Sequence, residues 1–155
     1  MNAMKVFIFI AFTTFVSLLT AEETPPLPEP SEPPYQVGAV PLKSGYTIKR
    51  ENAPDLNFRI VEKKMRLYWL DEKGRVMEPT VAAATVRFSG SVRGRSYHRL
   101  QPLAGDTALG SPYILVPPHL FNVSLVISPP DSDESKSYRF RYLPAMDEVG
   151  EPATD

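Results

Sequence analysis

Apolar and polar residues alternate along many short stretches of the chain, and this pattern predicts β-strands. Leu56, Phe58 and Ile60 alternate with Asn57 and Arg59, and a period of two places successive side chains on opposite faces of a strand. Similar stretches recur through residues 43–143, separated by Gly, Pro, Asp and Asn, and no segment has a helical period. Such spacing is typical of a β-sandwich or small barrel. We expect an all-β fold, an antiparallel immunoglobulin-like β-sandwich of seven or eight strands.

The expected strands are residues 56–61, 65–70, 75–77, 81–89, 95–100, 112–116, 120–127 and 138–143. Asp71-Glu-Lys-Gly74 predicts a turn with glycine in the left-handed conformation, joining the second and third of these strands into a hairpin. The bulky residues expected between the sheets are Phe58, Trp69, Phe88, Phe121, Phe140 and Tyr142.

Part of this pattern resembles a family of small exported bacterial sandwich proteins with an immunoglobulin-like fold. The first similar run is residues 65–79 (MRLYWLDEKGRVMEP), and it continues through residues 82–88, 100–106 and 120–127. Proteins of this architecture include periplasmic copper carriers and accessory proteins of metal-transport systems. The resemblance spans residues 56–128, and it implies a fold more than an activity.

Residues 1–21 have the layout of a secretory signal peptide. Lys5 precedes an uncharged run from Val6 to Leu19, and the small residue Ala21 precedes Glu22. An uncleaved membrane anchor is the alternative, although the run is shorter than the roughly 20 apolar residues that span a bilayer. We therefore expect a periplasmic or secreted protein, which contacts a membrane only if this segment is retained.

The residues on either side of the expected domain differ from it in composition. Residues 22–42 are acidic and proline-rich, and proline favours an extended spacer over a helix or a central strand. Residues 144–155 form a short acidic tail. The expected organisation is therefore a signal peptide (1–21), a proline-rich linker (22–42), a β-sandwich domain (43–143) and a disordered acidic tail (144–155).

Charge is distributed unevenly along the chain. Its formal net charge is −1, yet residues 43–101 hold 13 basic and six acidic residues, whereas residues 102–155 hold three basic and eight acidic ones. Nucleic acid is a poor partner for an exported chain of net negative charge. An anionic partner for the basic half is one interpretation, and ordinary solvated strand faces are the other.

Several arginines occupy strand positions whose parity is opposite to that of the apolar residues, so they should point outward. If their strands share a sheet, they would form a basic face suited to carboxylate, sulfate or phosphate groups. The partner would then be a protein or an anionic envelope component. The arginines selected for this face are Arg59, Arg66, Arg87, Arg99, Arg139 and Arg141.

A metal site is the alternative, given the resemblance to copper carriers. Copper sites in exported proteins use His and Met ligands, and the chain offers only His98 and His119 as histidines. Cysteine is absent, so no disulfide, thiolate metal site or lipid-attached cysteine is possible. No cofactor other than copper is implied.

Catalytic motifs are also missing from the sequence. It contains no Gly-x-Ser-x-Gly elbow, His-Glu-x-x-His pair or phosphate-binding loop. We therefore expect no enzyme but an exported, non-catalytic binding or structural module, with a metal carrier or metal-transport accessory protein as the alternative.

Overall fold

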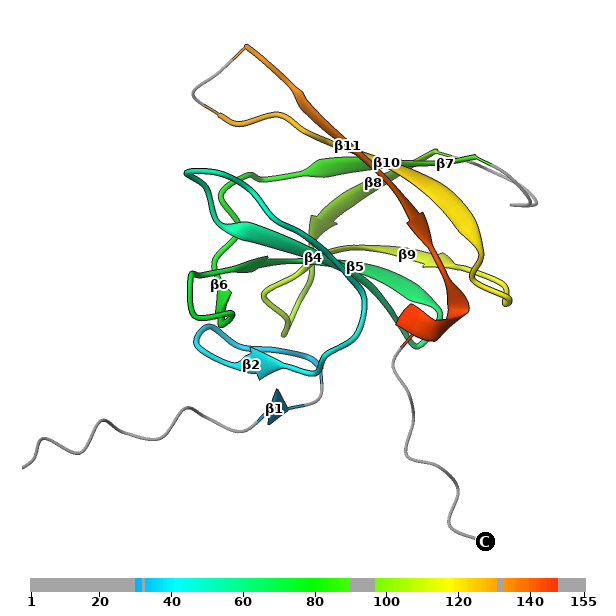
Figure 1. Cartoon of the computed structure of the whole chain (residues 1–155), viewed down its shortest axis with the longest axis horizontal. Helices are drawn as coiled ribbons and strands as arrows, with labels where there is room; N and C mark the ends of the chain where they lie inside the picture. The colour runs from blue at the N-terminus through cyan, green and yellow to red at the C-terminus, as the bar shows by residue number, and fades with distance from the viewer. Residues whose placement is uncertain (1–29, 32, 90–96, 131–132, 148–155) are drawn as a thin grey trace, which may run out of the picture.

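Antiparallel strands account for the architecture of the described part of the chain (Figure 1). The computed structural model describes residues 30–31, 33–89, 97–130 and 133–147. One sheet contains nine strands in the order β11-β10-β7-β8-β9-β5-β4-β3, with β6 paired to β5. These strands are β3 (Tyr46–Ile48), β4 (Asp55–Val61), β5 (Lys64–Leu70), β6 (Val76–Met77), β7 (Ala84–Ser89), β8 (Tyr97–Pro102), β9 (Leu109–Ile114), β10 (Phe121–Ile127) and β11 (Lys136–Tyr142).

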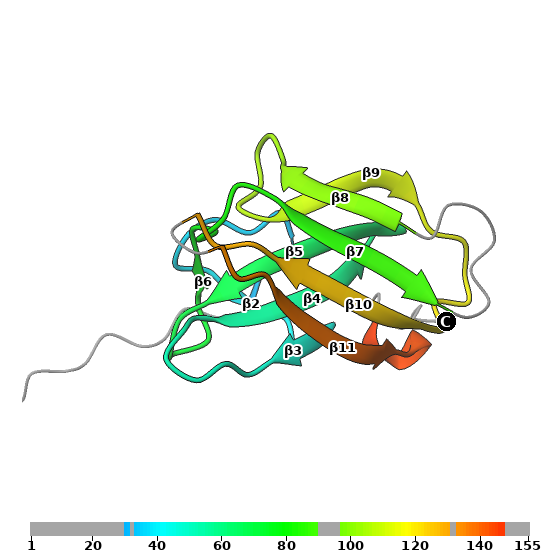
Figure 2. The same ribbon diagram turned by 90° about the horizontal axis from the view of Figure 1, so that it is seen from above.

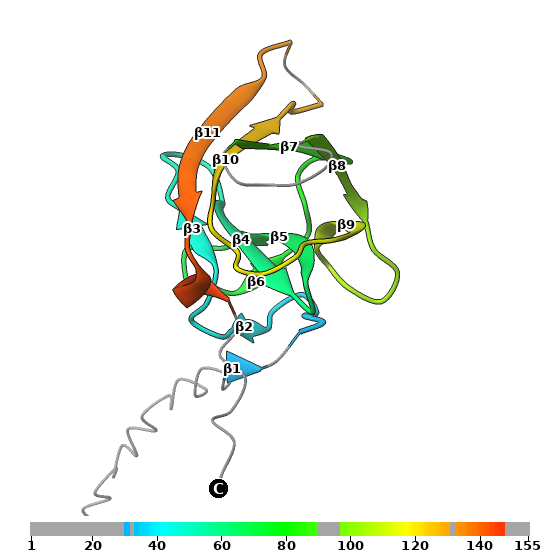
Figure 3. The ribbon, with the colours of Figure 1, turned by 90° about the vertical axis from the view of Figure 1, so that its right-hand side faces the viewer.

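The nine-stranded sheet curves until it is nearly a barrel (Figures 2 and 3). Strands β8 and β9 join its two halves through backbone pairing of Gln101 with Gly110 and of Pro102 with Leu109. On the opposite side the two edge strands, β3 and β11, lie side by side. The described residues of these edges share no backbone ladder; instead, the rings of Tyr46 and Phe140 stack at 4.3 Å between centroids. The prediction of an all-β antiparallel fold is confirmed, and its strands form one nearly closed sheet.

Strands β7 to β10 have Greek-key connectivity. Strands β7, β8 and β9 follow one another in the sheet, and β10 returns to pair with β7 on its other side. The β10–β11 hairpin then extends the sheet. As a result, β7, β8, β10 and β11 form one continuous half of the barrel wall, although the chain between them leaves this half at β9.

The six bulky residues expected in the interior are all buried in the core: Phe58, Trp69, Phe88, Phe121, Phe140 and Tyr142. Along β7 and β10, successive side chains point alternately into the barrel and outward, and those of Val86, Phe88, Val123 and Leu125 are buried inside. Trp69 is also buried there, and its indole N–H donates to Thr80 Oγ1 at 3.0 Å. Burial of these apolar side chains is the main source of stability in a chain without disulfides.

The hairpin predicted at residues 71–74 is confirmed. Trp69 pairs with Met77, and Gly74 has a φ of +74°. The carboxylate of Asp71 accepts hydrogen bonds from the backbone N–H groups of Lys73 and Arg75, and these bonds lower its pKa even though its partial burial acts in the opposite direction.

Two strands differ from expectation, since β3 (Tyr46–Ile48) was not expected and β9 lies at a shifted position. Strand β9 covers Leu109–Ile114, whereas Pro112 was expected to begin the strand. The pairing of β5 with β9 shifts register between Lys64 and Arg66, so the ladder is interrupted near this proline. A β-bulge tolerates a residue without an N–H donor, and proline therefore does not mark the boundary here.

Part of the proline-rich segment belongs to the folded body. Residues 35–45, which we call the strap, cross the outer surface of β4 and β5, and they include β2 (Val40–Pro41), which pairs in parallel with β1 (Pro30–Ser31). Backbone hydrogen bonds join Gly38 N to Val76 O (2.7 Å) and Val76 N to Ala39 O (2.8 Å). The structure thus places residues 35–42, expected as linker, against the sheet.

The chain also remains ordered beyond residue 143, where the tail was expected to begin. A 3₁₀-helix, η1 (Pro144–Met146), follows β11. The carbonyl of Met146 accepts from the backbone N–H of Gly45 (2.7 Å) and from the Tyr142 hydroxyl (3.1 Å). These bonds fasten the C-terminal end of the described chain to the end of the strap.

The signal peptide or anchor expected at residues 1–21 lies outside the described residues, as do linker residues 22–29 and tail residues 148–155. Within the described ranges, no helix has the length and apolar character needed to cross a bilayer.

Candidate functional site

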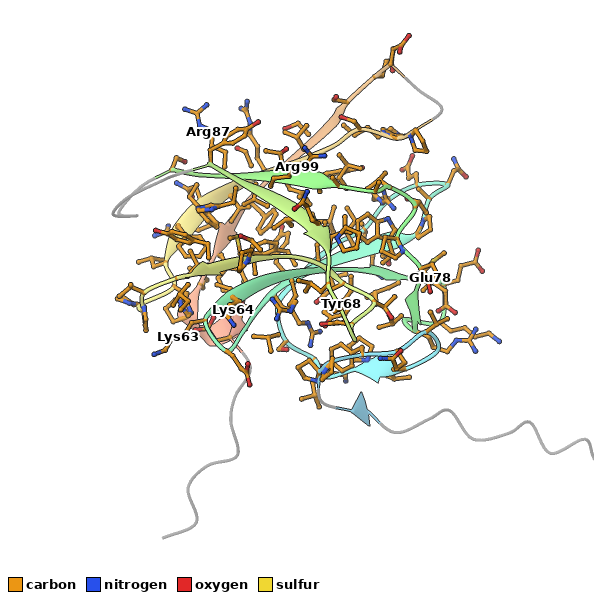
Figure 4. All side chains as sticks on the ribbon, turned by 180° about the vertical axis from the view of Figure 1, so that it is seen from behind. Lys63, Lys64, Tyr68, Glu78, Arg87 and Arg99 are labelled. Carbon is orange, nitrogen blue, oxygen red and sulfur yellow. The ribbon has the colours of Figure 1, made fainter. Side chains whose placement is uncertain are left out.

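The outer surface of β7, β8, β10 and β11 carries four of the six arginines selected from the sequence. We call this surface the arginine face, and its residues are those whose side chains alternate with the buried ones on these four strands. They are Thr85, Arg87, Ser89, Tyr97, Arg99, Gln101, Asn122, Ser124, Val126, Ser137, Arg139 and Arg141. The four arginines are exposed, and Figure 4 shows Arg87 and Arg99 on this half of the wall.

Strand register determines how the arginines lie relative to one another. Ser124 of β10 pairs with Arg139 on one side and with Arg87 on the other. Since neighbouring strands are about 4.8 Å apart, the Cα atoms of the two arginines lie about 10 Å apart, with the serine between them. The next pair along β10 places Asn122 between Arg141 and Ser89. The long guanidinium side chains therefore flank a row of short polar side chains.

A shallow groove of about 520 Å³ follows this row. It is lined by Arg87, Ser89, Asn122, Val123, Ser124, Arg139 and Phe140. The serine hydroxyls and the asparagine amide can donate hydrogen bonds from the floor, and the two guanidinium groups can donate from the sides. This combination suits an oxyanion such as phosphate, sulfate or carboxylate.

The arginine face contains no acidic residue, and none of its four arginines has an ion-pair partner among the described residues. Arginines elsewhere in the described chain differ in this respect. Arg75 lies 2.7 Å from the Asp71 carboxylate, and Arg66 lies 3.4 Å from that of Asp106. The positive charge of the face is thus not neutralised by the described part of the chain.

Arg59 and Arg66, the other two selected arginines, lie on β4 and β5, in the other half of the wall. Arg59 has the outward parity that was predicted, but it is only 1% exposed because the strap covers it. Parity alone does not distinguish a side chain facing solvent from one facing a covering segment. Arg59 is therefore a buried structural residue and does not belong to the arginine face.

Arg59 joins the strap to the sheet through every nitrogen of its guanidinium group. Nε donates to Asn57 Oδ1 (2.7 Å), Nη1 to the Tyr35 hydroxyl (2.8 Å), and Nη2 to the carbonyls of Leu42 (2.9 Å) and Ser44 (3.3 Å). The group also lies over the rings of Tyr35 and Tyr68, at 5.1 Å and 5.7 Å from their centroids. Among the described residues, neutral oxygens and aromatic rings thus surround the buried charge.

Tyr68 connects this cluster to the β8–β9 turn. Its hydroxyl donates to Asp106 Oδ2 at 2.8 Å. Burial, together with this hydrogen bond and the negative charge of the carboxylate, raises the pKa of Tyr68 far above its ordinary value. The phenol therefore stays protonated, and it has the surroundings of a structural hydrogen-bond donor rather than of a proton-transfer group.

The two histidines considered as metal ligands are both buried, in different surroundings. His98 lies inside the barrel against the rings of Phe88 (5.6 Å) and Tyr113 (4.4 Å). His119 Nδ1 lies 2.7 Å from Asp147 Oδ2, and its Nε2 lies 3.4 Å from the Leu115 carbonyl. Across the described ranges, no group of three or more His, Cys, Asp or Glu side chains is arranged to hold a metal ion.

Ser89, Asn122 and Ser124 were not selected from the sequence. Short polar residues are frequent at outward positions of strands, so their types carry no signal of their own. Their importance comes from the pairing of β10 between β7 and β11, which places Ser124 between Arg139 and Arg87 and places Asn122 between Arg141 and Ser89.

Comparison of the chain with protein-family models, with curated proteins and with solved structures gives no match.

Proposed function

We propose that the protein is an exported, non-catalytic binding module whose arginine face holds an anionic partner. The observation that carries this proposal is the presence of four exposed arginines on one acid-free surface, without ion-pair partners among the described residues. Export and a periplasmic or secreted location rest on the signal-peptide pattern of residues 1–21. The immunoglobulin-like topology also remains a prediction, drawn from the pattern of strands.

The partner presents several phosphate, sulfate or carboxylate groups on an extended surface. Arg87 and Arg139 would contact one such group in the groove, with Ser124 beneath it. Arg99 and Arg141 would contact neighbouring groups. Because these arginines are exposed, their attraction to the partner is screened by salt over about 10 Å at 0.1 M ionic strength.

Titration with dextran sulfate, a soluble polyanion, tests the proposal. The double variant Arg87→Gln/Arg139→Gln should bind at least about tenfold more weakly, since each lost charge-assisted hydrogen bond is worth about 1.5–3 kcal/mol. Affinity of the wild-type protein should also fall as salt is added.

The matched control is Lys49→Gln/Lys73→Gln, which removes the same charge from exposed sites elsewhere. This control should retain most of the affinity. Equal losses in the two double variants would show a general effect of net charge and would refute a specific arginine face, as would binding that is independent of salt.

A further inference from the structure

A second surface, distinct from the arginine face, is found at one end of the barrel. Strand register assigns to this end the β4–β5 turn, the β9–β10 connection and the residues after β11, and Figure 1 shows these segments together on the right. Six side chains here, Lys63, Lys64, Ile114, Val116, Leu120 and Leu143, make up what we call the basic-apolar tip.

Exposed aliphatic side chains are concentrated at this tip. Val116 is 81% exposed, Ile114 57%, Leu120 41% and Leu143 37%. Among the described residues, the other large apolar side chains that are exposed are Tyr97, which begins β8 at the same end of the barrel, and Val37 in the strap. Apolar groups gathered on one surface, rather than scattered singly, mark an interaction site.

The tip is held in place by the protein rather than left loose. Leu115 N donates to Lys63 O at 2.7 Å, and Leu120 N donates to Pro118 O at 2.9 Å. Pro117 and Pro118 fix their own φ angles directly after Val116. Little conformational freedom is therefore lost when the tip binds, which favours affinity.

Lysines accompany the apolar side chains. Lys64 pairs with Ile114 across the β5–β9 ladder, and Lys63 lies in the adjoining turn beside Glu62. The other described carboxylate near this end, Asp147, lies against His119. The tip thus combines aliphatic and cationic groups.

The remaining described carboxylates belong to the turns and connections of the opposite end: Glu51, Asp55, Asp71, Glu72, Glu78, Asp106, Asp133 and Glu134. Figure 4 shows Lys63 and Lys64 at one end of the molecule and Glu78 at the other. The same turns and connections also hold five basic residues, Lys49, Arg50, Lys73, Arg75 and Lys136, so the eight carboxylates leave this end with an excess of negative charge. An excess of this kind at one end orients a protein in the field of an anionic surface. It would turn the tip toward that surface and the acidic turns away from it.

We infer that the basic-apolar tip docks on an anionic lipid surface. Aliphatic side chains would enter the boundary between headgroups and acyl chains, and the two lysines would contact the anionic headgroups. The tip fits a lipid surface because its apolar side chains come from separate connections at an end of the barrel and are accompanied by cations. This inference does not depend on the arginine face, and either surface can function without the other.

Cosedimentation of the full chain with lipid vesicles tests the inference. Vesicles of phosphatidylcholine mixed with phosphatidylglycerol should bind the protein, whereas vesicles of phosphatidylcholine alone should bind it far more weakly. Since each basic residue near an anionic surface contributes about fivefold in affinity, Lys63→Gln/Lys64→Gln should weaken binding roughly 30-fold. Val116→Asp should weaken it by about tenfold or more, because a charged side chain replaces an inserting apolar one.

Val37→Asp is the matched control, since it makes the same change at another exposed valine, away from the tip. It should leave vesicle binding unchanged. A tryptophan placed at the tip by Val116→Trp should shift its emission to shorter wavelength on anionic vesicles, whereas Val37→Trp should not.

Three results would overturn the inference. One is equal binding to the two kinds of vesicle, including none to either, and another is an equal effect of the aspartate at positions 37 and 116. The third is a loss of vesicle binding in Arg87→Gln/Arg139→Gln but not in the tip variants. That outcome would assign vesicle binding to the arginine face and leave the proposed function standing.

Discussion

Replacing Arg59 by methionine should destabilise the protein by about 3 kcal/mol and loosen the strap. Methionine retains much of the apolar stem but donates no hydrogen bond. The buried side-chain oxygen of Asn57, Oδ1, which accepts from Arg59 Nε at 2.7 Å, would lose this donor. An unsatisfied buried acceptor costs about 1–3 kcal/mol, and each of the two ring contacts adds about 0.5–1 kcal/mol.

Arg66→Met supplies a matched control, because Arg66 pairs directly with Arg59 across the β4–β5 ladder. The Arg66 side chain is 16% exposed, and its ion-pair partner Asp106 lies at 3.4 Å. This contact is long, and without it Asp106 still accepts from the Tyr68 hydroxyl (2.8 Å) and from Ala108 N (3.2 Å), so its loss should cost about 1 kcal/mol. The two variants therefore make the same chemical change on neighbouring strands, with and without the covering strap.

Urea unfolding followed by the fluorescence of Trp69, which is the only tryptophan and is buried, gives the free energy of unfolding. Limited proteolysis should also cleave the strap faster in Arg59→Met. Tyr35→Phe should destabilise the wild-type protein more than it destabilises Arg59→Met, because the lost hydrogen bond is shared. The reasoning fails if Arg59→Met costs no more than Arg66→Met, or if the effects of Arg59→Met and Tyr35→Phe simply add.

Two further predictions concern the backbone and pH. Gly45→Ala should lower the free energy of unfolding by at least about 2 kcal/mol, since Gly45 has a φ of +76° and an added Cβ would lie 2.5 Å from the Phe58 carbonyl oxygen. Gly74→Ala is the control, because Gly74 has a similar φ of +74° but open space around the new Cβ, and it should cost about 1 kcal/mol. Equal costs of the two variants in urea unfolding would contradict the steric argument. Burial, aided by nearby carboxylates, raises the pKa of Tyr68 and Tyr142 in the folded protein, whereas the unfolded chain ionises near pKa 10. The unfolded state therefore loses protons first, so the contribution of these two phenols to stability should be constant below about pH 10 and should decrease above it, by up to about 2.7 kcal/mol per pH unit. A flat profile between pH 9 and 11 in urea titrations would show that these phenols are not protected.

Much of the barrel could be predicted from the sequence because burial imposes a period of two on each strand. The positions of Val86, Phe88, Val123 and Leu125 inside the barrel follow directly from this alternation. The strap could not be predicted in the same way, because its prolines indicate an extended segment whether or not the segment is packed. Tyr35 gives no signal in the sequence that it will meet an arginine 24 residues later in the chain.

The site was partly predictable for a related reason. Parity placed Arg87, Arg99, Arg139 and Arg141 on the outside of their strands, but their meeting on one surface depends on strand order. That order comes from the return of β10 to the far side of β7, a long-range pairing that no local pattern specifies. Arg59 has the same outward parity, but the strap covers it and leaves it buried.

The seam between β3 and β11 makes the two sides of the barrel mechanically unequal. At the β8–β9 junction, separating the halves would break backbone hydrogen bonds. At the seam, it would first part the stacked rings of Tyr46 and Phe140, and ring contacts can slide and re-form without breaking the ladder of either strand. The sheet is therefore joined by backbone hydrogen bonds on one side and by side-chain contacts on the other. Local opening of the barrel should begin at the seam between β3 and β11, which would make the seam the route by which water first reaches the core.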